Sequence, residues 1–334
     1  MFSYRHAFHA GNHADVLKHL ALIATLRHLL RKDGALLAVD THAGAGLYRL
    51  DSDFTRTAGE AAEGIERLFA HERGAADASV AGHSEVKHPD PSAKRSDLAI
   101  YFEADPLGDY LDLVASFNPP GVLRVYPGSP FVMQRLLRPD HRDRLKLFEL
   151  HPTDSKTLAA NVAQLHAGRM IAVARQDGFE GLKALLPPPP AAGGSRRALV
   201  LIDPSYEIKS DYARVTAALA DSLKRFATGT YLIWYPIIPR PEAHELPRRL
   251  RTLSQQARRP WLHATLSIGA AVDPAASAAL APGEPRHHGL RASGLWVVNP
   301  PHTLKPALQA ALPRVLAALG RGTGKGYTID SGGG

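Results

Sequence analysis

Residues 197–206 read RALVLIDPSY, and this stretch decides the fold because an apolar run passes directly into a turn of polar residues and proline. The run 199–202 is short, contains only Leu, Val and Ile, and is followed by breaking residues, which is typical of a strand buried on both faces. A helix-compatible segment at 211–227 follows the turn. The stretch therefore predicts a strand–turn–helix unit whose polar residues lie at the carboxyl end of the strand.

The same alternation of strand and helix extends outward in both directions. Further strands are predicted at 36–40, 123–128, 146–152, 169–178 and 229–237. Apolar residues at helical spacing predict a first helix over 14–32. Buried strands that alternate with helices predict an α/β fold with a doubly wound, mostly parallel, Rossmann-like sheet. Two late apolar runs, at 260–268 and 293–301, predict an antiparallel edge.

Composition divides the chain into four parts. Residues 1–50 contain an N-terminal segment and the start of the core, and 123–322 contain the rest of the core. Between them, 51–122 have two helix-compatible stretches around a polar segment rich in Ala, Ser and Gly, which predicts an inserted helical subdomain. The Gly-rich end, 323–334, predicts a flexible tail.

Overall composition restricts the classes of protein that this chain fits. Hydrophobic residues make up 45% and charged residues 22%, which is a globular balance. No apolar run is long enough to span a bilayer and the start has no signal-peptide pattern, so we expect a cytoplasmic protein with no membrane partner. The absence of cysteine excludes disulfides, Cys-based zinc sites and thiol nucleophiles. The net charge of +8 suits a polyanionic partner, although an ordinary solvated surface explains it equally well.

An acidic residue ends each of four predicted strands. These residues are Asp40, Glu149, Asp177 and Asp203. Ligands of open α/β sheets bind beyond the carboxyl ends of the strands, so we expect the four carboxylates to surround one site. A loop with Gly44 and Gly46 follows the first of them, but it has neither the G-x-G-x-x-G spacing nor the Lys-Ser/Thr pair of a P-loop. It is compatible with the amino-acid half of S-adenosylmethionine, and a plain glycine turn is the alternative.

Two of these acidic residues suit the nucleoside part of a cofactor. A carboxylate at the position of Glu149 accepts hydrogen bonds from ribose hydroxyls in nucleotide-binding sheets. The alternative for Glu149 is a helix cap, a role for which Thr153 to Ser155 are better placed. Asp177 is expected to accept a hydrogen bond from the adenine amino group of the cofactor.

The turn Asp203-Pro204-Ser205-Tyr206 resembles the Asp-Pro-Pro-Tyr motif of amino-nitrogen methyltransferases. The amino group of adenine is a poor nucleophile because its lone pair is delocalised into the ring. A carboxylate and a carbonyl that accept its hydrogen bonds favour a pyramidal nitrogen, which attacks a sulfonium methyl in line. The aromatic residue of the motif would stack on the base. An ordinary Asp-Pro-Ser turn after a strand is the alternative.

Several longer motifs resemble one family, the bacterial 23S ribosomal RNA adenine-N6 methyltransferases of the large-subunit methyltransferase J type. They run through nearly the whole chain: Ser3 to His6, Phe8 to His19, Asp40 to Gly46, Tyr126 to Pro130, Glu149 to Pro152, Asp177-Gly178, Lys224 to Gly229, Trp234 to Pro236 and Ala292 to Gly294. The resemblance implies methyl transfer from S-adenosylmethionine to N6 of one adenine, number 2030 of 23S rRNA. The RNA would be free or in an early assembly intermediate, and the enzyme a monomer that needs no metal.

The resemblance also implies roles for individual residues. Cofactor contacts would come from His19, His42, Ser129, Glu149, Asp177, Gly178 and Asp203. The catalytic group would comprise Asp203, Pro204 and Tyr206, with Asp203 as the acceptor of the proton or hydrogen bond. The substrate base would be handled by Tyr4, His6, Lys18 and Tyr206. Ser205 replaces the second proline of the family motif, while Pro204, whose carbonyl is the one required, is retained.

Two other functions fit parts of the sequence. A DNA adenine-N6 methyltransferase would share the catalytic turn, although the insertion is small for a target-recognition domain. A non-catalytic RNA-binding protein would keep a degenerate cofactor pocket, but the retained Asp203, Pro204 and Tyr206 argue against it. The histidines His6, His9, His13, His19 and His42 show no metal-ligand spacing, so we expect no metal site.

Overall fold

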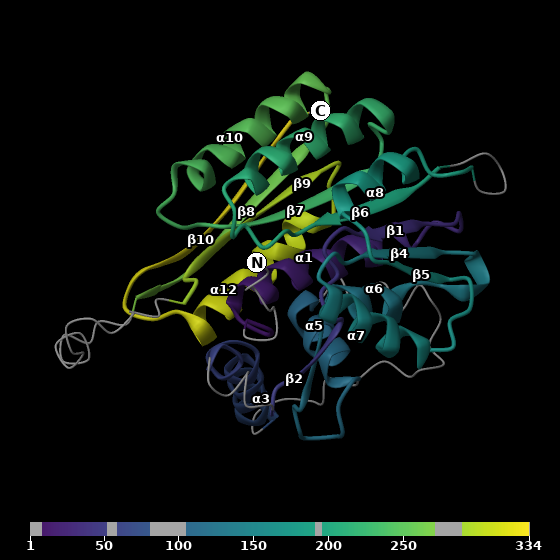
Figure 1. Ribbon diagram of the computed structural model, residues 1–334. Helices are drawn as coiled ribbons and strands as arrows, with labels where there is room; N and C mark the ends of the chain where they lie inside the picture. Colours follow the sequence, from purple (N-terminus) through teal and green to yellow (C-terminus); the bar gives the residue numbers. More distant parts are fainter. Residues whose placement is uncertain (1–8, 52–58, 81–104, 191–195, 271–288, 334) are drawn as a thin grey trace.

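The fold is an eight-stranded mixed sheet between two layers of helices (Figure 1). The computed structural model describes residues 9–51, 59–80, 105–190, 196–270 and 289–333. In chain order the strands of the sheet are β1 (Leu37–Asp40), β4 (Arg144–Phe148), β5 (Ile171–Ala174), β6 (Ala198–Ile202), β7 (Thr230–Pro236), β8 (Trp261–Ala270), β9 (Ala292–Val298) and β10 (Thr323–Gly332). Their spatial order is β10-β8-β9-β7-β6-β1-β4-β5.

The sheet has a parallel half and an antiparallel half. Strands β5, β4, β1, β6 and β7 are parallel neighbours, whereas β9 runs antiparallel to both β7 and β8, and β10 antiparallel to β8. β1 and β6 are buried along their whole length, because helices cover both of their faces. The predicted Rossmann-like fold with an antiparallel edge is confirmed.

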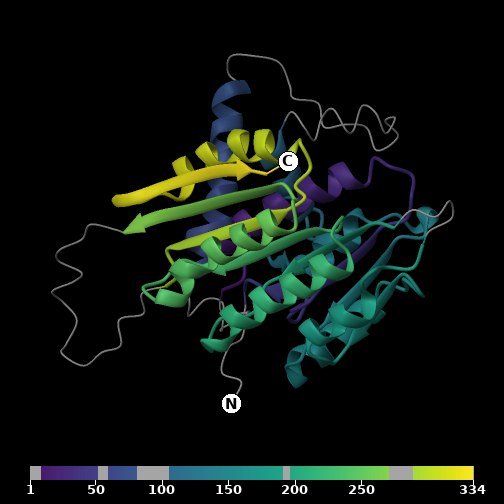
Figure 2. The ribbon, with the colours of Figure 1, turned by 90° about the horizontal axis from the view of Figure 1, so that it is seen from above.

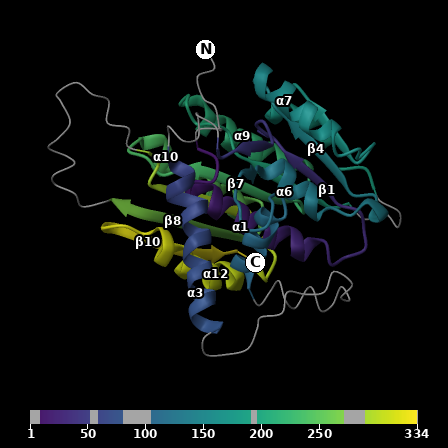
Figure 3. The ribbon, with the colours of Figure 1, turned by 90° about the horizontal axis from the view of Figure 1, so that it is seen from below.

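Two sets of helices cover the two faces of the sheet, and each has its own hydrophobic core. One face carries α1 (His13–Leu29), α5 (Pro106–Ala115), α6 (Ser129–Leu136), α7 (Pro152–Ala163) and α12 (Leu304–Leu319). The other face carries α8 (Gly178–Leu185), α9 (Ser210–Arg225) and α10 (Pro241–Gln256). The view from above shows α9 and α10 across the sheet (Figure 2), and the view from below shows α1, α6 and α12 on the opposite face (Figure 3). None of the described helices is long and apolar enough to cross a membrane.

The described part of the region 51–122 packs into the main core. Its described part holds a π-helical turn (Ala62–Glu66), α3 (Arg67–Val80) and α5, and α3 packs against α12 while α5 packs against α1 and α12. Ile65, Leu68 and Tyr110 are fully buried in the same core as α1. The inserted helical subdomain stays a prediction, since 52–58 and 81–104 lie outside the described residues, and these side chains make the described helices part of the main core.

Two short strands lie apart from the main sheet. The predicted strand at 123–128 is β3 (Val125–Pro127), and it pairs antiparallel with β2 (Leu47–Arg49) in a separate two-stranded sheet. A 3₁₀ turn (Pro139–His141) leads into β4. The small sheet places the loop before α6 beside the turn after β1, because the Gly128 amide donates a hydrogen bond to the Gly46 carbonyl at 2.8 Å.

The prediction of a flexible tail over 323–334 is wrong for its described part. β10 pairs with β8 from Thr323↔Ala270 to Gly332↔Trp261. Backbone hydrogen bonds to β8 hold this strand, and Ile329 packs against the main core although most β10 side chains are exposed. The prediction relied on glycine content, but the backbone hydrogen bonds that order this strand do not depend on side chains.

Candidate active site

A cavity of about 360 Å³ lies at the carboxyl ends of β1, β4 and β6. The parallel register aligns these ends, since Asp40 is opposite both Leu147 and Leu201. The volume falls in the range of small-molecule sites. Eight of the predicted site residues line the cavity: Lys18, His42, Ser129, Glu149, Asp177, Gly178, Asp203 and Pro204.

The glycine turn after β1 and the end of β4 meet at Glu149. Its two carboxylate oxygens accept hydrogen bonds from the backbone amides of Gly44 and His151, both at 2.7 Å. Gly44 has φ +59°, and a Cβ there would collide with the Tyr48 hydroxyl. Burial raises the pKa of Glu149, and the two amide hydrogen bonds oppose that rise. Glu149 thus fastens the glycine turn to the start of α7, with its carboxylate on the cavity wall.

The first turn of α8 carries the second carboxylate. Asp177 caps the helix, because its Oδ1 accepts hydrogen bonds from the amides of Phe179 and Glu180. Its Oδ2 is ion-paired with Arg214 of α9, whose guanidinium lies 4.6 Å from the Phe179 ring centroid. Burial opposes ionisation, but the Arg214 pairing outweighs it and lowers the pKa of Asp177. Gly178 lies against the Thr41 carbonyl, with no room for a Cβ.

His42 lies between the β1 turn and α8. Its ring packs edge-on against Phe179, with 4.9 Å between the ring centroids. Burial lowers the pKa of His42 to about 4, so the imidazole is neutral at neutral pH. The neutral His42 ring gives this part of the cavity wall a flat aromatic surface, beside the ion pair of Asp177 and Arg214, and such a surface suits the face of a purine.

Ser129 lines the floor of the cavity, and Asp40 lies buried beneath it. Asp40 is fully buried, and its carboxylate accepts hydrogen bonds from the Ser129 hydroxyl at 2.6 Å and the His42 amide at 3.2 Å. Burial raises the pKa of Asp40 to about 6, against the effect of those hydrogen bonds. Ser129 reaches the floor because Gly128 and Pro130 start α6 at this point.

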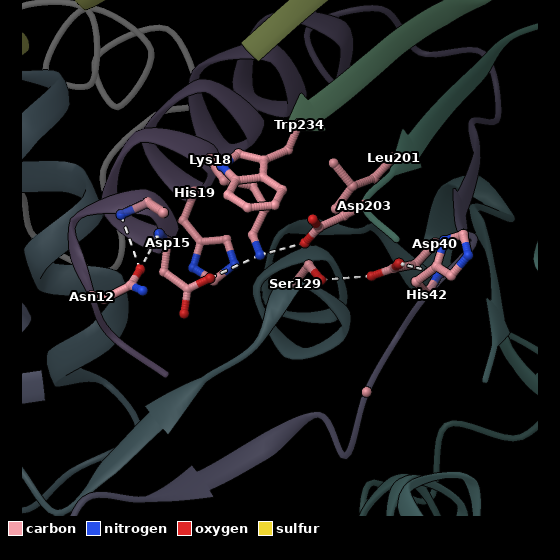
Figure 4. Close-up of polar contacts among 12 residues, drawn as sticks. Asn12, Asp15, Lys18, His19, Asp40, His42, Ser129, Leu201, Asp203 and Trp234 are labelled. Atoms are coloured by element: carbon pink, nitrogen blue, oxygen red, sulfur yellow. Dashed lines mark hydrogen bonds and ion pairs between the residues drawn. The ribbon is translucent and has the colours of Figure 1, made fainter. Parts of the chain in front are cut away.

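Asp203 follows β6, on the other side of β1 from Glu149 and Asp177, which follow β4 and β5, and it defines the second end of the cavity. Figure 4 shows Asp203 together with Lys18. The Lys18 ammonium lies 2.6 Å from Asp203 Oδ2 and 2.8 Å from Asp15 Oδ1. Burial disfavours the charge of Lys18, but the two carboxylates outweigh it and raise its pKa. Within the described residues, Asp203 Oδ1 and the Pro204 carbonyl have no hydrogen-bond donor. This end of the cavity is therefore lined by two residues that each have an acceptor without a donor in the described part of the chain.

The remaining predicted site residues lie elsewhere or outside the described chain. His19 is fully buried, with Nδ1 2.7 Å from the Tyr126 hydroxyl, and it does not line the cavity. Tyr206 is only 2% exposed, and its hydroxyl donates to the Trp234 carbonyl at 2.7 Å. Tyr4 and His6 lie outside the described residues.

Sequence reasoning missed Asp15 and Arg214. Asp15 had a detectable signal, because it lies three residues before Lys18 and both interrupt the apolar pattern of a buried helix. Polar side chains on such a face need partners. Arg214 gave no such signal in the sequence, because it is one of several charged residues on α9 and lies 37 residues from its partner Asp177.

The residues present fit S-adenosylmethionine. The cavity combines carboxylates for amino and hydroxyl donors, glycines that let a ligand approach the backbone, and the aromatic wall at His42 and Phe179. No group of three or more His, Asp or Glu side chains suited to a metal ion occurs in the described part of the chain. Lys18 and Asp203 face the same cavity, as required of groups that act on a second substrate.

Comparison with known proteins gives consistent matches over nearly the whole chain. A family model described as ribosomal RNA large subunit methyltransferase D, RlmJ, matches residues 33–80 and 103–330. The ribosomal RNA large subunit methyltransferase J of Escherichia coli K12 is 38% identical over 313 residues, covering 94% of this chain and 92% of that protein. The Haemophilus influenzae Rd protein of the same name is 36% identical over 332 residues, covering 99% and 98%.

A solved structure also matches this chain. A Legionella pneumophila protein of known crystal structure superimposes with a TM-score of 0.72 at 29% sequence identity, covering 97% of this chain and 98% of that one. The match therefore extends over nearly the full length of both chains.

Proposed function

This chain belongs to the family of ribosomal RNA large subunit methyltransferases, and from that premise we propose that it transfers a methyl group from S-adenosylmethionine to an adenine N6 in 23S rRNA. The position would be adenine 2030, as the family implies. The proposal rests on membership of the family together with the chemistry of the turn that ends β6.

One observation carries the chemical part of the proposal. Asp203 and Pro204 both line the cavity, Lys18 holds one oxygen of Asp203, and no described residue donates a hydrogen bond to Asp203 Oδ1 or to the Pro204 carbonyl. An amino group has two hydrogens, so two adjacent acceptors fix its orientation. Acceptors on both hydrogens also favour the pyramidal nitrogen that can attack.

When bound, S-adenosylmethionine supplies an electrophilic methyl group on a sulfonium sulfur. Asp203 and Pro204 bind and orient the amino group, and Oδ1 of Asp203 is placed to accept the proton that the nitrogen must lose. Lys18 keeps the Asp203 carboxylate in one orientation through its hydrogen bond to Oδ2. Pro204 is the residue of the turn whose carbonyl matters, so Ser205 is compatible with this scheme.

The other end of the cavity would hold the cofactor. We assign ribose hydroxyls to Glu149, the adenine ring to the wall at His42, and its amino group to Asp177. Gly178 supports this assignment because it brings the α8 backbone against the β1 turn. Ser129 would act from the cavity floor, through its hydrogen bond to Asp40. His19 would contribute only indirectly, because it is buried against Tyr126 and does not line the cavity.

The test is methyl transfer from labelled S-adenosylmethionine by the purified full chain, followed by digestion to nucleosides. Substrates are protein-free 23S rRNA, assembled large subunits and duplex DNA. We expect label in N6-methyladenosine from protein-free 23S rRNA and little from assembled subunits. Label from DNA alone would establish the DNA methyltransferase alternative, and no transfer to any substrate would favour an RNA-binding protein.

We also propose a setting for the activity. The enzyme would act as a monomer in the cytoplasm, on 23S rRNA that is free or in an early assembly intermediate. The net charge of +8 supports binding to a polyanion without a partner subunit. Light scattering of the purified chain, with and without RNA, measures the stoichiometry, and a stable dimer would contradict this part of the proposal.

A further inference from the structure

Tyr206, the aromatic residue of the β6 turn, presents no open ring face. The ring packs against Tyr212, with 4.7 Å between centroids, and the residue is only 2% exposed. Its hydroxyl donates to the Trp234 carbonyl, and Arg240 donates to the Tyr206 carbonyl at 3.1 Å. Its φ of +55° is the left-handed conformation, which the surrounding contacts must hold in place. Tyr206 therefore joins the turn to β7 and is a positioning residue.

Trp234 lies beside Asp203 at the carboxyl end of the parallel strands, although it is not among the residues that line the cavity. β6 and β7 are parallel with Ile202 opposite Ile233, so Asp203 and Trp234 are the next opposite positions at the carboxyl end of the sheet. Side chains at opposite positions of neighbouring strands project to the same face. The Lys18 ammonium, 2.6 Å from Asp203, lies 5.9 Å from the centroid of the Trp234 ring (Figure 4).

The Trp234 side chain is not fully enclosed by the protein. It is partly exposed, unlike the Tyr206 ring that it contacts. Its indole N–H has no acceptor among the described residues.

We propose that Trp234 is the aromatic residue against which the substrate purine packs when its amino group reaches Asp203 and Pro204. The inference rests on the proposed function and adds to it a residue that binds the substrate base. Base–aromatic packing contributes strongly to single-stranded nucleic acid binding and tolerates any base, so selectivity for adenine would still come from the two acceptors. The indole sets the plane of the base, and Asp203 with Pro204 fix its edge.

The test measures intrinsic fluorescence during titration with adenosine monophosphate, in the presence of S-adenosylhomocysteine. The chain has three tryptophans, and Trp261 and Trp296 stack on each other at 4.6 Å in the antiparallel half of the sheet. We expect the nucleotide to quench wild-type fluorescence. Trp234→Phe should abolish the quench. A quench that persists in Trp234→Phe would overturn the inference, since it would arise from the other two tryptophans.

Methyl transfer to 23S rRNA provides the second readout. Trp234→Ala should weaken kcat/KM by about tenfold, and Trp234→Phe should recover most of it, because a ring of any kind can stack. Affinity for S-adenosylhomocysteine, measured by calorimetry, should stay at the wild-type value in both variants. Normal kcat/KM in Trp234→Ala would sink this inference and leave the proposed function intact, whereas a wild-type chain inactive on every RNA would sink the proposed function itself.

Discussion

The two ends of the cavity use the same sequence pattern for different purposes. At one end, Glu149 and Asp177 each follow a strand, and every carboxylate oxygen accepts a backbone amide or an Arg214 hydrogen bond. At the other end, Asp203 also follows a strand, but Lys18 holds only one of its oxygens. A carboxylate whose oxygens are occupied shapes a binding wall, whereas one with an open oxygen can take up a hydrogen bond or a proton from a substrate.

The largest expected effect is at the open carboxylate. Asp203→Ala should reduce methyl transfer by roughly 10³-fold, because it removes the acceptor of the amino group. The matched control is Asp140→Ala, which removes an exposed aspartate in the 3₁₀ turn before β4. Single-turnover assays with labelled cofactor measure both, and circular dichroism checks the fold. Near-normal transfer by Asp203→Ala would show that the Asp203 carboxylate is no more important for methyl transfer than the carboxylates at the other end of the cavity.

The next effect is on stability. Lys18→Met leaves Asp15 and Asp203 as buried carboxylates without a cation, and breaking such a pair costs about 3–5 kcal/mol. Lys183→Met is the control, because Lys183 pairs with Glu180 at the same i,i+3 spacing and the same 2.8 Å, but on the surface. Exposed pairs contribute only about 0–1 kcal/mol. Urea unfolding compares the two, and equal losses would show that burial of Lys18 has no energetic consequence.

Stability should depend on pH through Asp40, which is buried beneath the cavity. Asp40 has its pKa raised from 3.8 to about 6 by burial, so the folded chain binds more protons than the unfolded chain between these values. The contribution of Asp40 to the free energy of unfolding therefore falls as pH rises from about 4 to about 6, by up to about 3 kcal/mol. Asp40→Asn should lack this fall, so its stability relative to the wild type should increase over that window and then stay constant. A difference that is flat or slopes the other way contradicts the raised pKa.

The smallest effect should be at Arg214. Arg214→Ala leaves Asp177 without its ion pair, so affinity for S-adenosylhomocysteine should fall by about 3–10-fold, a modest loss because the arginine is 39% exposed. Transfer at saturating cofactor should stay normal, and Arg214→Lys should recover part of the affinity. Arg225→Ala, on the same helix with an i,i+4 partner and 41% exposure, is the calorimetric control. An equal change in both variants would show that Asp177 needs no such partner.

The positions of the acidic residues at the strand ends were predictable from sequence, whereas their ion pairs with distant residues were not. Carboxyl ends of parallel strands meet at one edge, so Asp203 and Glu149 could be placed in one site from their positions after apolar runs. The ion pair between Lys18 and Asp203 joins residues 185 apart, and periodicity carries no information about such pairing. The resemblance to a family suggested Lys18 as a substrate residue but did not suggest its contact with Asp203.

Two expectations from motifs differ from the structure for local reasons. Tyr206 was expected to face a base, but the left-handed backbone and the hydrogen bond to Trp234 turn its ring into the core. The tail was expected to be flexible, but β8 offers an open edge that β10 fills. In both cases the deciding partner belongs to another strand, which residue type alone does not reveal.

The most direct test of the distinction between the two ends compares Asp203→Asn with Glu149→Gln at saturating cofactor and saturating 23S rRNA. Both substitutions keep the shape of the side chain and remove one charge. Under saturation, weaker cofactor binding is masked, so the single-turnover rate reports only the chemical step. We expect a rate roughly 10³-fold below the wild type for Asp203→Asn and within about threefold of it for Glu149→Gln. Equal losses in the two variants would contradict the division of the cavity into a binding end and a transfer end.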